Sequence, residues 1–228
     1  MLGAGNFRDA KASVYNALNL DRGEALAWAV LGLIDFYENR VLNSLESLYI
    51  ANYRDPSEPD YVFSLAQVAA RAEKYKEAAE AYRRFLVLSP DEDEERRARI
   101  KGLIEFLGFL GNKQSLYVLD GQDKTTVKFA LTGNRPVIEL KINNKEEPLR
   151  FVLDTGSGIS VISDETAKRL RIKDVARGGM ARGIGGGGKF EIVYGFLRSV
   201  EIGNARIKNV PVYIRKFHTH NEKIDGYI

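Results

Sequence analysis

The feature that most constrains this chain is the tetrapeptide Asp-Thr-Gly-Ser at residues 154–157, which lies between short apolar segments. Residues 136–143 (PVIELKIN) and 149–154 (LRFVLD) are rich in Val, Ile, Leu and Phe, and this composition predicts β-strands. Residues 143–147 (NNKEE) between them are typical of a hairpin turn. After the tetrapeptide, residues 158–163 (GISVIS) predict a further short strand. The side chain of Asp154 is therefore expected at the tip of a loop whose backbone is held on both sides.

A short helix is expected next, over residues 164–170 (DETAKRL). Ser163 precedes it, and serine is favoured as an N-cap because its hydroxyl accepts a hydrogen bond from the first helical turn. An aspartate in an ordinary β-turn is the plainer interpretation of the tetrapeptide. The strands and the helix that surround the tetrapeptide in this order favour a functional role instead.

A carboxylate fixed at a loop tip can perform acid–base catalysis when a second carboxylate faces it. The two then share one proton, so that one acts as general base on a water molecule and the other as general acid on the leaving group. Only one Asp-Thr-Gly occurs in this chain. The partner of Asp154 is therefore expected to be the same residue of a second copy of the chain.

From about residue 125 onward, the chain resembles the retropepsin-like aspartyl proteases, which include the retroviral proteases and many bacterial relatives. Besides the Asp-Thr-Gly, residues 180–214 match the family's flap hairpin and the paired strands after it. Residues 198–202 and 210–214 predict these strands, and Gly203 with Asn204 between them is a hairpin signal. The flap closes over bound peptide, and its tip matches Gly183, Ile184, Gly185 and Gly186.

The same resemblance implies an all-β acid-protease fold and an aspartic endopeptidase that acts on peptide or protein substrates as a homodimer. Asp154 of each subunit would activate the water, while Thr155 and Gly156 would brace the turn. Ser157 is close enough in sequence to hydrogen-bond the carboxylate and lower its pKa, which would favour acidic operation. No metal ion or organic cofactor is implied.

Two other interpretations of local motifs are weaker. Residues 183–189 (GIGGGGK) satisfy the first seven positions of a phosphate-binding loop, but Phe190 replaces the required Ser or Thr and a strand is expected to follow. The two histidines, His218 and His220, lack the further ligands that a metal site would need. Neither suits a Ser-His-Asp or Cys-His arrangement, and the chain has no cysteine.

The first half of the chain repeats itself at a spacing of 34 residues. This period resembles the tetratricopeptide repeat, in which small residues let two helices cross closely and a proline ends the second helix. Asp35 departs from that family, which prefers an aromatic residue there, and a generic helical bundle is the alternative. The matching positions are Trp28, Leu31, Gly32, Ser44, Leu48, Ala51 and Pro56, followed by Val62, Leu65, Ala66, Ala78, Tyr82, Phe85 and Pro90.

Further helices are expected on either side of these repeats. Residues 6–20 match the second helix of a repeat, with Ala10 and Ala17 at its small positions. Residues 93–110 predict a helix that caps the stack with an apolar stripe of Ile100, Leu103, Ile104 and Leu107. At the other end, residues 224–228 (IDGYI) match only the start of the segment that closes the protease family's pattern. A piece of a longer protein, with the protease domain truncated, is therefore expected.

These observations predict a multidomain α and β protein, with tetratricopeptide-like helical repeats over residues 1–112 and a retropepsin-like domain over residues 113–228. The first half carries 14 Lys and Arg against 18 Asp and Glu, and the second carries 20 against 13, so their net charges are −4 and +7. Two differently solvated surfaces are the favoured explanation. The more specific alternatives are electrostatic attraction between the two halves and a preference of the second half for acidic peptides. No basic run interleaved with aromatics indicates nucleic-acid binding.

The repeats are expected to present a groove to a peptide or partner protein. The rival hypothesis is a non-catalytic binding or scaffolding protein in which the protease fold serves as a dimeriser. No signal peptide or membrane-spanning run is visible, and the absence of cysteine fits both an oxidising compartment and the cytosol. Bacterial relatives with this architecture often carry export signals, so the resemblance favours a periplasmic or secreted location over the cytoplasm.

Overall fold

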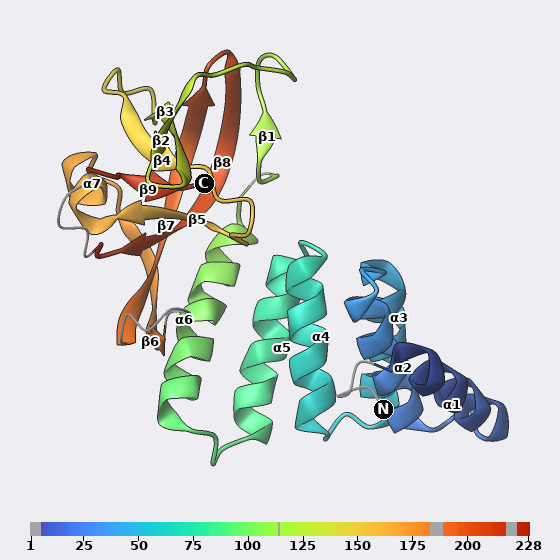
Figure 1. Cartoon of the computed structure of the whole chain (residues 1–228). Helices are drawn as coiled ribbons and strands as arrows, with labels where there is room; N and C mark the ends of the chain where they lie inside the picture. Colours follow the sequence, from blue (N-terminus) through green and yellow to red (C-terminus); the bar gives the residue numbers. More distant parts are fainter. Residues whose placement is uncertain (1–5, 114, 183–188, 218–222) are drawn as a thin grey trace. The chain divides into compact units, whose positions relative to one another are not determined.

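The computed structural model of the chain describes residues 6–113, 115–182, 189–217 and 223–228. The chain forms two compact units, Met1–Asn112 and Lys113–Ile228, each with its own hydrophobic core. The first unit is helical, and the second consists mainly of β-strands (Figure 1). The expected combination of a helical repeat fold with a β-rich fold is confirmed.

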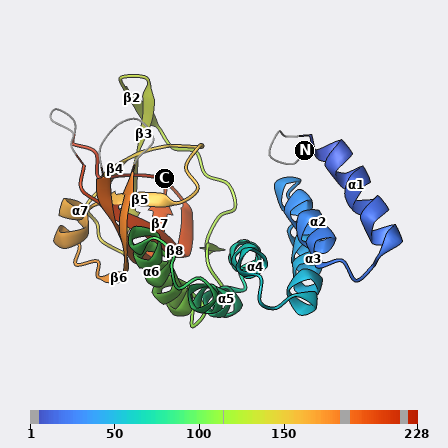
Figure 2. The same cartoon turned by 90° about the horizontal axis from the view of Figure 1, so that it is seen from below.

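The first unit contains six helices in its described residues, and consecutive helices pack against each other (Figure 2). They are α1 (Phe7–Leu20), α2 (Ala25–Tyr37), α3 (Val41–Arg54), α4 (Pro59–Arg71), α5 (Tyr75–Leu88) and α6 (Glu94–Leu110). The helical hairpin α4–α5 begins 34 residues after the hairpin α2–α3. The period of the sequence is therefore the period of the helical hairpins.

The two helices of the first hairpin cross at small residues. A Cβ atom on Gly32 would lie 2.7 Å from Leu48 Cγ and 3.1 Å from the carbonyl oxygen of Ser44. The buried hydroxyl of Ser44 donates a 2.7 Å hydrogen bond to the carbonyl oxygen of Gly32. This close approach explains why the sequence has a glycine and a serine at these two positions of the repeat.

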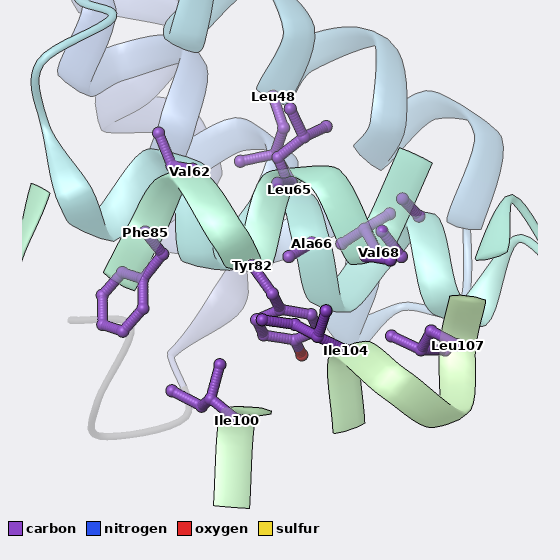
Figure 3. Packing of buried hydrophobic residues seen from close by; sticks show 14 of the residues in the cluster. Leu48, Val62, Leu65, Ala66, Val68, Tyr82, Phe85, Ile100, Ile104 and Leu107 are labelled. Carbon is purple, nitrogen blue, oxygen red and sulfur yellow. The ribbon is translucent and has the colours of Figure 1, made fainter. Parts of the chain in front are cut away.

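Apolar side chains from α3 to α6 form one hydrophobic cluster of the first unit (Figure 3), and α1 and α2 form another. The matching positions of the two repeats supply much of it, and the expected stripe of α6 packs onto the second hairpin. The repeat residues are Leu48, Val62, Leu65, Ala66, Ala78, Tyr82 and Phe85, and the α6 residues are Ile100, Leu103, Ile104 and Leu107.

Asp35 occupies the position where the repeat family prefers an aromatic residue, and its side chain is buried. Arg40 Nε donates a 3.0 Å hydrogen bond to Asp35 Oδ1, and Arg40 also forms an ion pair with Glu38. Burying a carboxylate is costly unless it is paired and hydrogen-bonded. Arg40 is thus the residue that compensates for the departure from the repeat pattern.

The first unit is expected to lose stability at alkaline pH because of Tyr82. Burial raises the pKa of Tyr82 to about 12, whereas an unfolded tyrosine titrates near pH 10. Between these values the unfolded chain has lost the proton and the folded chain has kept it, so a rising pH favours unfolding. We expect Tyr82 to contribute a loss of roughly 2–3 kcal/mol over this interval.

Urea unfolding at several alkaline pH values, followed by the fluorescence of the single tryptophan Trp28, measures this effect. Tyr82→Phe keeps the buried ring and removes the titrating group, so its stability should depend less steeply on pH. The same slope in the variant and in the parent would contradict the assignment to Tyr82.

In the second unit, nine described strands form a single mixed sheet with the neighbour order β1-β8-β5-β9-β4-β3-β7-β6, and β2 pairs with β3. Since β7 also pairs with β8, six of these strands close into a ring. The strands are β1 (Val118–Leu119), β2 (Phe129–Thr132), β3 (Arg135–Ile142), β4 (Leu149–Val152), β5 (Ser160–Ser163), β6 (Asp174–Arg182), β7 (Lys189–Ile202), β8 (Ala205–Arg215) and β9 (Gly226–Tyr227), and a short helix, α7 (Asp164–Arg169), follows β5.

The turn, the helix cap and the hairpin predicted around the tetrapeptide are all formed in the structure. Asn143 and Asn144 both have positive φ angles, 54° and 60°, and form a tight turn at the end of β3, closed by a 3.0 Å hydrogen bond from Lys145 N to the carbonyl oxygen of Ile142. Thr166 N donates a 3.0 Å hydrogen bond to Ser163 Oγ, so Ser163 caps α7. The predicted strands at 198–202 and 210–214 are parts of the longer β7 and β8, which Gly203 joins with a φ of 56°.

The strand β9 lies between β4 and β5, and its first residue has no room for a side chain. Gly226 faces Phe151 in a parallel pair and Ile162 in an antiparallel pair. A Cβ atom on Gly226 would overlap a ring carbon of Phe151 and the carbonyl oxygen of Val161. The glycine therefore allows a third strand to enter between the two strands that flank the tetrapeptide.

Gly226→Ala is expected to lower the free energy of unfolding of the second unit by about 3 kcal/mol, at the upper end of what overpacking costs. Gly108→Ala in α6 is the matched control, because its methyl group would meet no atom within 4 Å. That change should stabilise the first unit by about 0.5–1 kcal/mol. Calorimetric unfolding of both variants tests the pair, and a Gly226→Ala protein as stable as the parent would contradict the packing described.

Candidate active site

Asp154 lies two residues beyond the end of β4, in a loop fixed by backbone hydrogen bonds. Asp154 N donates to the carbonyl oxygen of Ile228, directly after β9 (2.8 Å), and Ser157 N donates to the carbonyl oxygen of Asp154 (3.1 Å). Gly156 N donates to the carboxylate oxygen Oδ1 at 3.1 Å. Asp154 is nevertheless exposed. The loop thus orients the carboxylate through one oxygen, and the other makes no hydrogen bond within the described part of the chain.

The rest of the tetrapeptide forms the exposed turn itself, which contains Thr155 and Gly156. The hydroxyl of Ser157 donates a 2.7 Å hydrogen bond to the carbonyl oxygen of Ile159. The expected hydrogen bond from Ser157 to the Asp154 carboxylate is therefore not present, because the hydroxyl is used within the loop.

The expected flap tip, comprising Gly183, Ile184, Gly185 and Gly186, lies outside the described residues. The two strands that lead to it, β6 and β7, pair as far as Arg182 opposite Lys189. Arg177 of β6 ties them together, because its guanidinium donates to Asp174 on its own strand (2.6 Å) and to Glu191 on β7 (2.7 Å). The hydrogen bond from Arg177 lowers the pKa of Asp174.

Asp225 supports the candidate site, a role that was not predicted from the sequence. Its side chain is only 5% exposed. Oδ1 accepts hydrogen bonds from Thr166 Oγ1 (2.6 Å) and Arg169 Nη2 (2.9 Å) of α7, and Oδ2 accepts one from Arg150 N of β4 (2.9 Å). One buried carboxylate thus joins α7, β4 and the start of β9.

The backbone of Asp225 continues this connection towards Asp154. Ser163 N donates to the carbonyl oxygen of Asp225 at 2.8 Å, and Ile228, three residues later, holds Asp154 N. Asp225 therefore anchors one end of β9, and the other end anchors the tetrapeptide. The sequence did contain a signal, because a lone acid in the apolar run IDGYI must be paired if it is buried.

A cavity of about 470 Å³ lies elsewhere in the second unit, between α7 and strands β6, β7 and β8. Arg215 stacks on Phe190 at its side, with the guanidinium carbon 4.0 Å from the ring centroid. None of residues 154–157 lines this cavity. This cavity is therefore separate from the exposed turn that carries the tetrapeptide.

Within the described ranges, no group of three or more His, Cys, Asp and Glu residues is arranged to hold a metal ion. His218 and His220 lie outside these ranges. None of the described helices is both long enough and apolar enough to span a bilayer.

The family model of aspartyl proteases matches residues 138–228, which include the tetrapeptide and β9. No curated protein matches the chain. Among solved structures, a retropepsin-like aspartic protease from Rickettsia conorii is 16% identical, covers 50% of this chain and 80% of that protein, and gives a TM-score of 0.34.

Two other similar structures are the MamA protein and a chaperone. MamA is 22% identical over 49% of this chain with a TM-score of 0.43, and this chain covers only 60% of it. The type III secretion chaperone SycD of Yersinia enterocolitica, in complex with a peptide of the translocator YopD, is 18% identical over 47% of this chain and 84% of the chaperone, with a TM-score of 0.43.

The ring of strands, the Asp-Thr-Gly turn and the match of residues 138–228 to the aspartyl protease family fit a retropepsin-like domain in the second unit. This domain follows tetratricopeptide-like helical repeats in the first unit.

Proposed function

We propose that this protein is an aspartic endopeptidase in which a water molecule is activated between the Asp154 carboxylates of two copies. The observation that carries the proposal is the geometry of Asp154, an exposed carboxylate on a loop whose backbone is fixed by Ile228 and Ser157. The match of residues 138–228 to aspartyl proteases supports a peptide bond as the substrate.

In the proposed mechanism, the two carboxylates lie so close together that they cannot both be ionised. The ionised one removes a proton from the water as the water attacks the peptide carbonyl carbon. The protonated one donates its proton to the leaving nitrogen, so that the carbon–nitrogen bond breaks and the amine leaves while the carbonyl re-forms as a carboxylic acid. Gly156 N, bound to Oδ1, orients each carboxylate for this exchange.

A peptide mimic tests this proposal independently of any variant. A hydroxyethylene group in place of the cleaved bond resembles the tetrahedral transition state, so such a peptide should bind much more tightly than the substrate and inhibit cleavage. Cleavage of a peptide library, followed by mass spectrometry from acidic to neutral pH, supplies the substrate. A folded dimer that neither cleaves peptides nor binds the mimic would favour the scaffolding hypothesis.

We further propose that the repeats bind the substrate or a partner protein. Among the described residues of the first unit lie an open cavity of about 290 Å³ between α1 and α2 and another of about 460 Å³. The larger is lined by residues of the types that most often dominate protein interfaces, aromatic residues and arginine. They are Trp28, Tyr49 and Tyr53, with Arg22 and Arg54.

The exposed Tyr53 gives a test of the repeat site. Tyr53→Ala should weaken binding of a protein substrate about tenfold, which corresponds to the loss of one aromatic anchor. Cleavage of a short peptide that reaches only the second unit should not change. An unchanged KM for the protein substrate would argue against this surface.

A further inference from the structure

The cavity of about 470 Å³ in the second unit lies between a helix and one face of the sheet. Ile214 of β8 pairs with Ile162 of β5 and with Val193 of β7, so these three residues share that face. Ala167 of α7 packs into the same hydrophobic cluster as Ile162 and Ile214. Ala167, Val193 and Ile214 line the cavity, and residues 154–157 do not. The cavity thus has an apolar lining of its own and is distinct from the candidate active site.

The wall of this cavity carries more positive than negative side chains. Asp164 is already paired with Lys168 at 3.2 Å. Arg177 is paired with Asp174 at 2.6 Å and with Glu191 at 2.7 Å. Five cations against three carboxylates leave the wall a net charge of 5 − 3 = +2, which attracts an anionic group. The cations are Lys168, Arg177, Lys189, Arg215 and Lys216, and the carboxylates are Asp164, Asp174 and Glu191.

Arg215, at the end of β8, is suited to bind a carboxylate at this wall. Its guanidinium carbon lies 4.0 Å from the centroid of the Phe190 ring, and both residues line the cavity. A guanidinium that stacks on an aromatic ring keeps the N–H donors of its edge available, and these donors match the two oxygens of a carboxylate. Lys216 follows directly in the chain, is exposed and adds a second positive charge.

The volume of the cavity suits an occupant that also has an apolar part. Ligand sites in proteins measure about 300–1,000 Å³ and combine an apolar lining with a few polar groups that fix orientation. The 470 Å³ of this cavity fall within that range. Ile172, which follows α7, adds to the apolar lining. An anionic group at Arg215 and an apolar side chain against the sheet would therefore be accommodated together.

We propose that this cavity is a second binding site of the domain, for a peptide segment in which acidic and apolar residues are neighbours. Charge complementarity favours an acidic segment, because the second half of the chain carries a net charge of +7 in addition to the cations of the wall. The match to aspartyl proteases favours a peptide as the partner. The inference goes beyond the proposed function, because binding in the cavity requires neither the Asp154 turn nor cleavage.

Three capped hexapeptides test the chemistry of the site by calorimetric titration of the whole chain. The first alternates Asp and Leu, the second replaces each Asp by Asn, and the third replaces each Leu by Ser. The first should bind at least about tenfold more tightly than either of the others. Equal binding of the Asn peptide or of the Ser peptide would overturn the proposal. Octanoate is the small-molecule alternative, and binding of octanoate without binding of the first peptide would also overturn it.

A photoreactive leucine in the first peptide identifies where it binds. Mass spectrometry should find the cross-links on α7 and on the cavity-lining parts of β6, β7 and β8. Saturation with the hydroxyethylene mimic should not reduce these cross-links. The absence of cross-links from the cavity wall, or their loss in the presence of the mimic, would overturn the assignment. If the cavity is labelled but no peptide is cleaved, the binding site stands and the proposed protease function fails.

Lys216→Glu provides an independent test by reversing one charge of the wall. Lys216 is exposed, so the fold should not depend on it. Binding of the Asp–Leu hexapeptide should weaken about tenfold. Lys128→Glu is the matched control, because it makes the same change at an exposed lysine in the segment before β2 that does not line the cavity. Equal affinities of the two variants would overturn the proposal.

Discussion

Asp154→Asn is expected to lower the rate of peptide cleavage by about 10²–10⁴-fold, the range over which a general base contributes to catalysis. An amide cannot take the proton from water, and in a homodimer the substitution removes both members of the dyad. The amide oxygen can still accept the hydrogen bond that Gly156 N donates to Oδ1. The loop and the dimer should therefore persist, so that the loss appears in kcat.

The matched control is Asp123→Asn, the same change at an exposed aspartate in the segment before β2. Its activity should equal that of the parent. Residual cleavage above about a tenth of the parent rate in Asp154→Asn would contradict the assigned role, because one general base accounts for far more. Sedimentation and circular dichroism on the same samples establish that the variants are folded and dimeric.

Asp225→Ala is expected to lower the free energy of unfolding of the second unit by about 3–5 kcal/mol, as is typical when one partner of a buried ion pair is removed. The Arg169 guanidinium, the Thr166 hydroxyl and the Arg150 N–H would all lose an acceptor. The strand β9 would lose its anchor, and with it the tetrapeptide would lose its support. Asp225→Asn keeps part of the hydrogen bonding and should cost less.

Hydrogen exchange resolves this effect by position. The amides of residues 150–163 should exchange faster in Asp225→Ala, because Asp225 and Ile228 hold that segment. Trp28, the only tryptophan, lies in the first unit, so its fluorescence during urea unfolding serves as an internal control that should not change. Exchange at the parent rate throughout residues 150–163 would show that Asp225 does not support the site.

The features predicted correctly from the sequence depend on local chemistry. A serine before the acidic start of a short helix forms an N-cap, and paired asparagines form a tight turn, wherever the rest of the chain lies. The 34-residue period of the first half is also local, since each helical hairpin contacts mainly its neighbours.

The support of the candidate site was not predictable in this way. The contact of Arg150 with Asp225 joins residues 75 positions apart, and a short polar residue in a sequence does not reveal its distant partner. From the sequence, the Ser157 hydroxyl could bind the carboxylate of Asp154. The path of the loop instead places it against the carbonyl oxygen of Ile159, to which it donates its hydrogen bond. Long-range pairing and the choice between nearby acceptors are properties of the folded backbone.

The position of β9 in the sheet also bears on how the protein folds during its synthesis. During translation, Asp154 leaves the ribosome well before Gly226 and Ile228, the residues that enter between β4 and β5 and hold the backbone of Asp154. Contacts between distant residues form late in folding. A nascent chain thus carries an unsupported Asp-Thr-Gly turn until the segment that supports the turn has been synthesised.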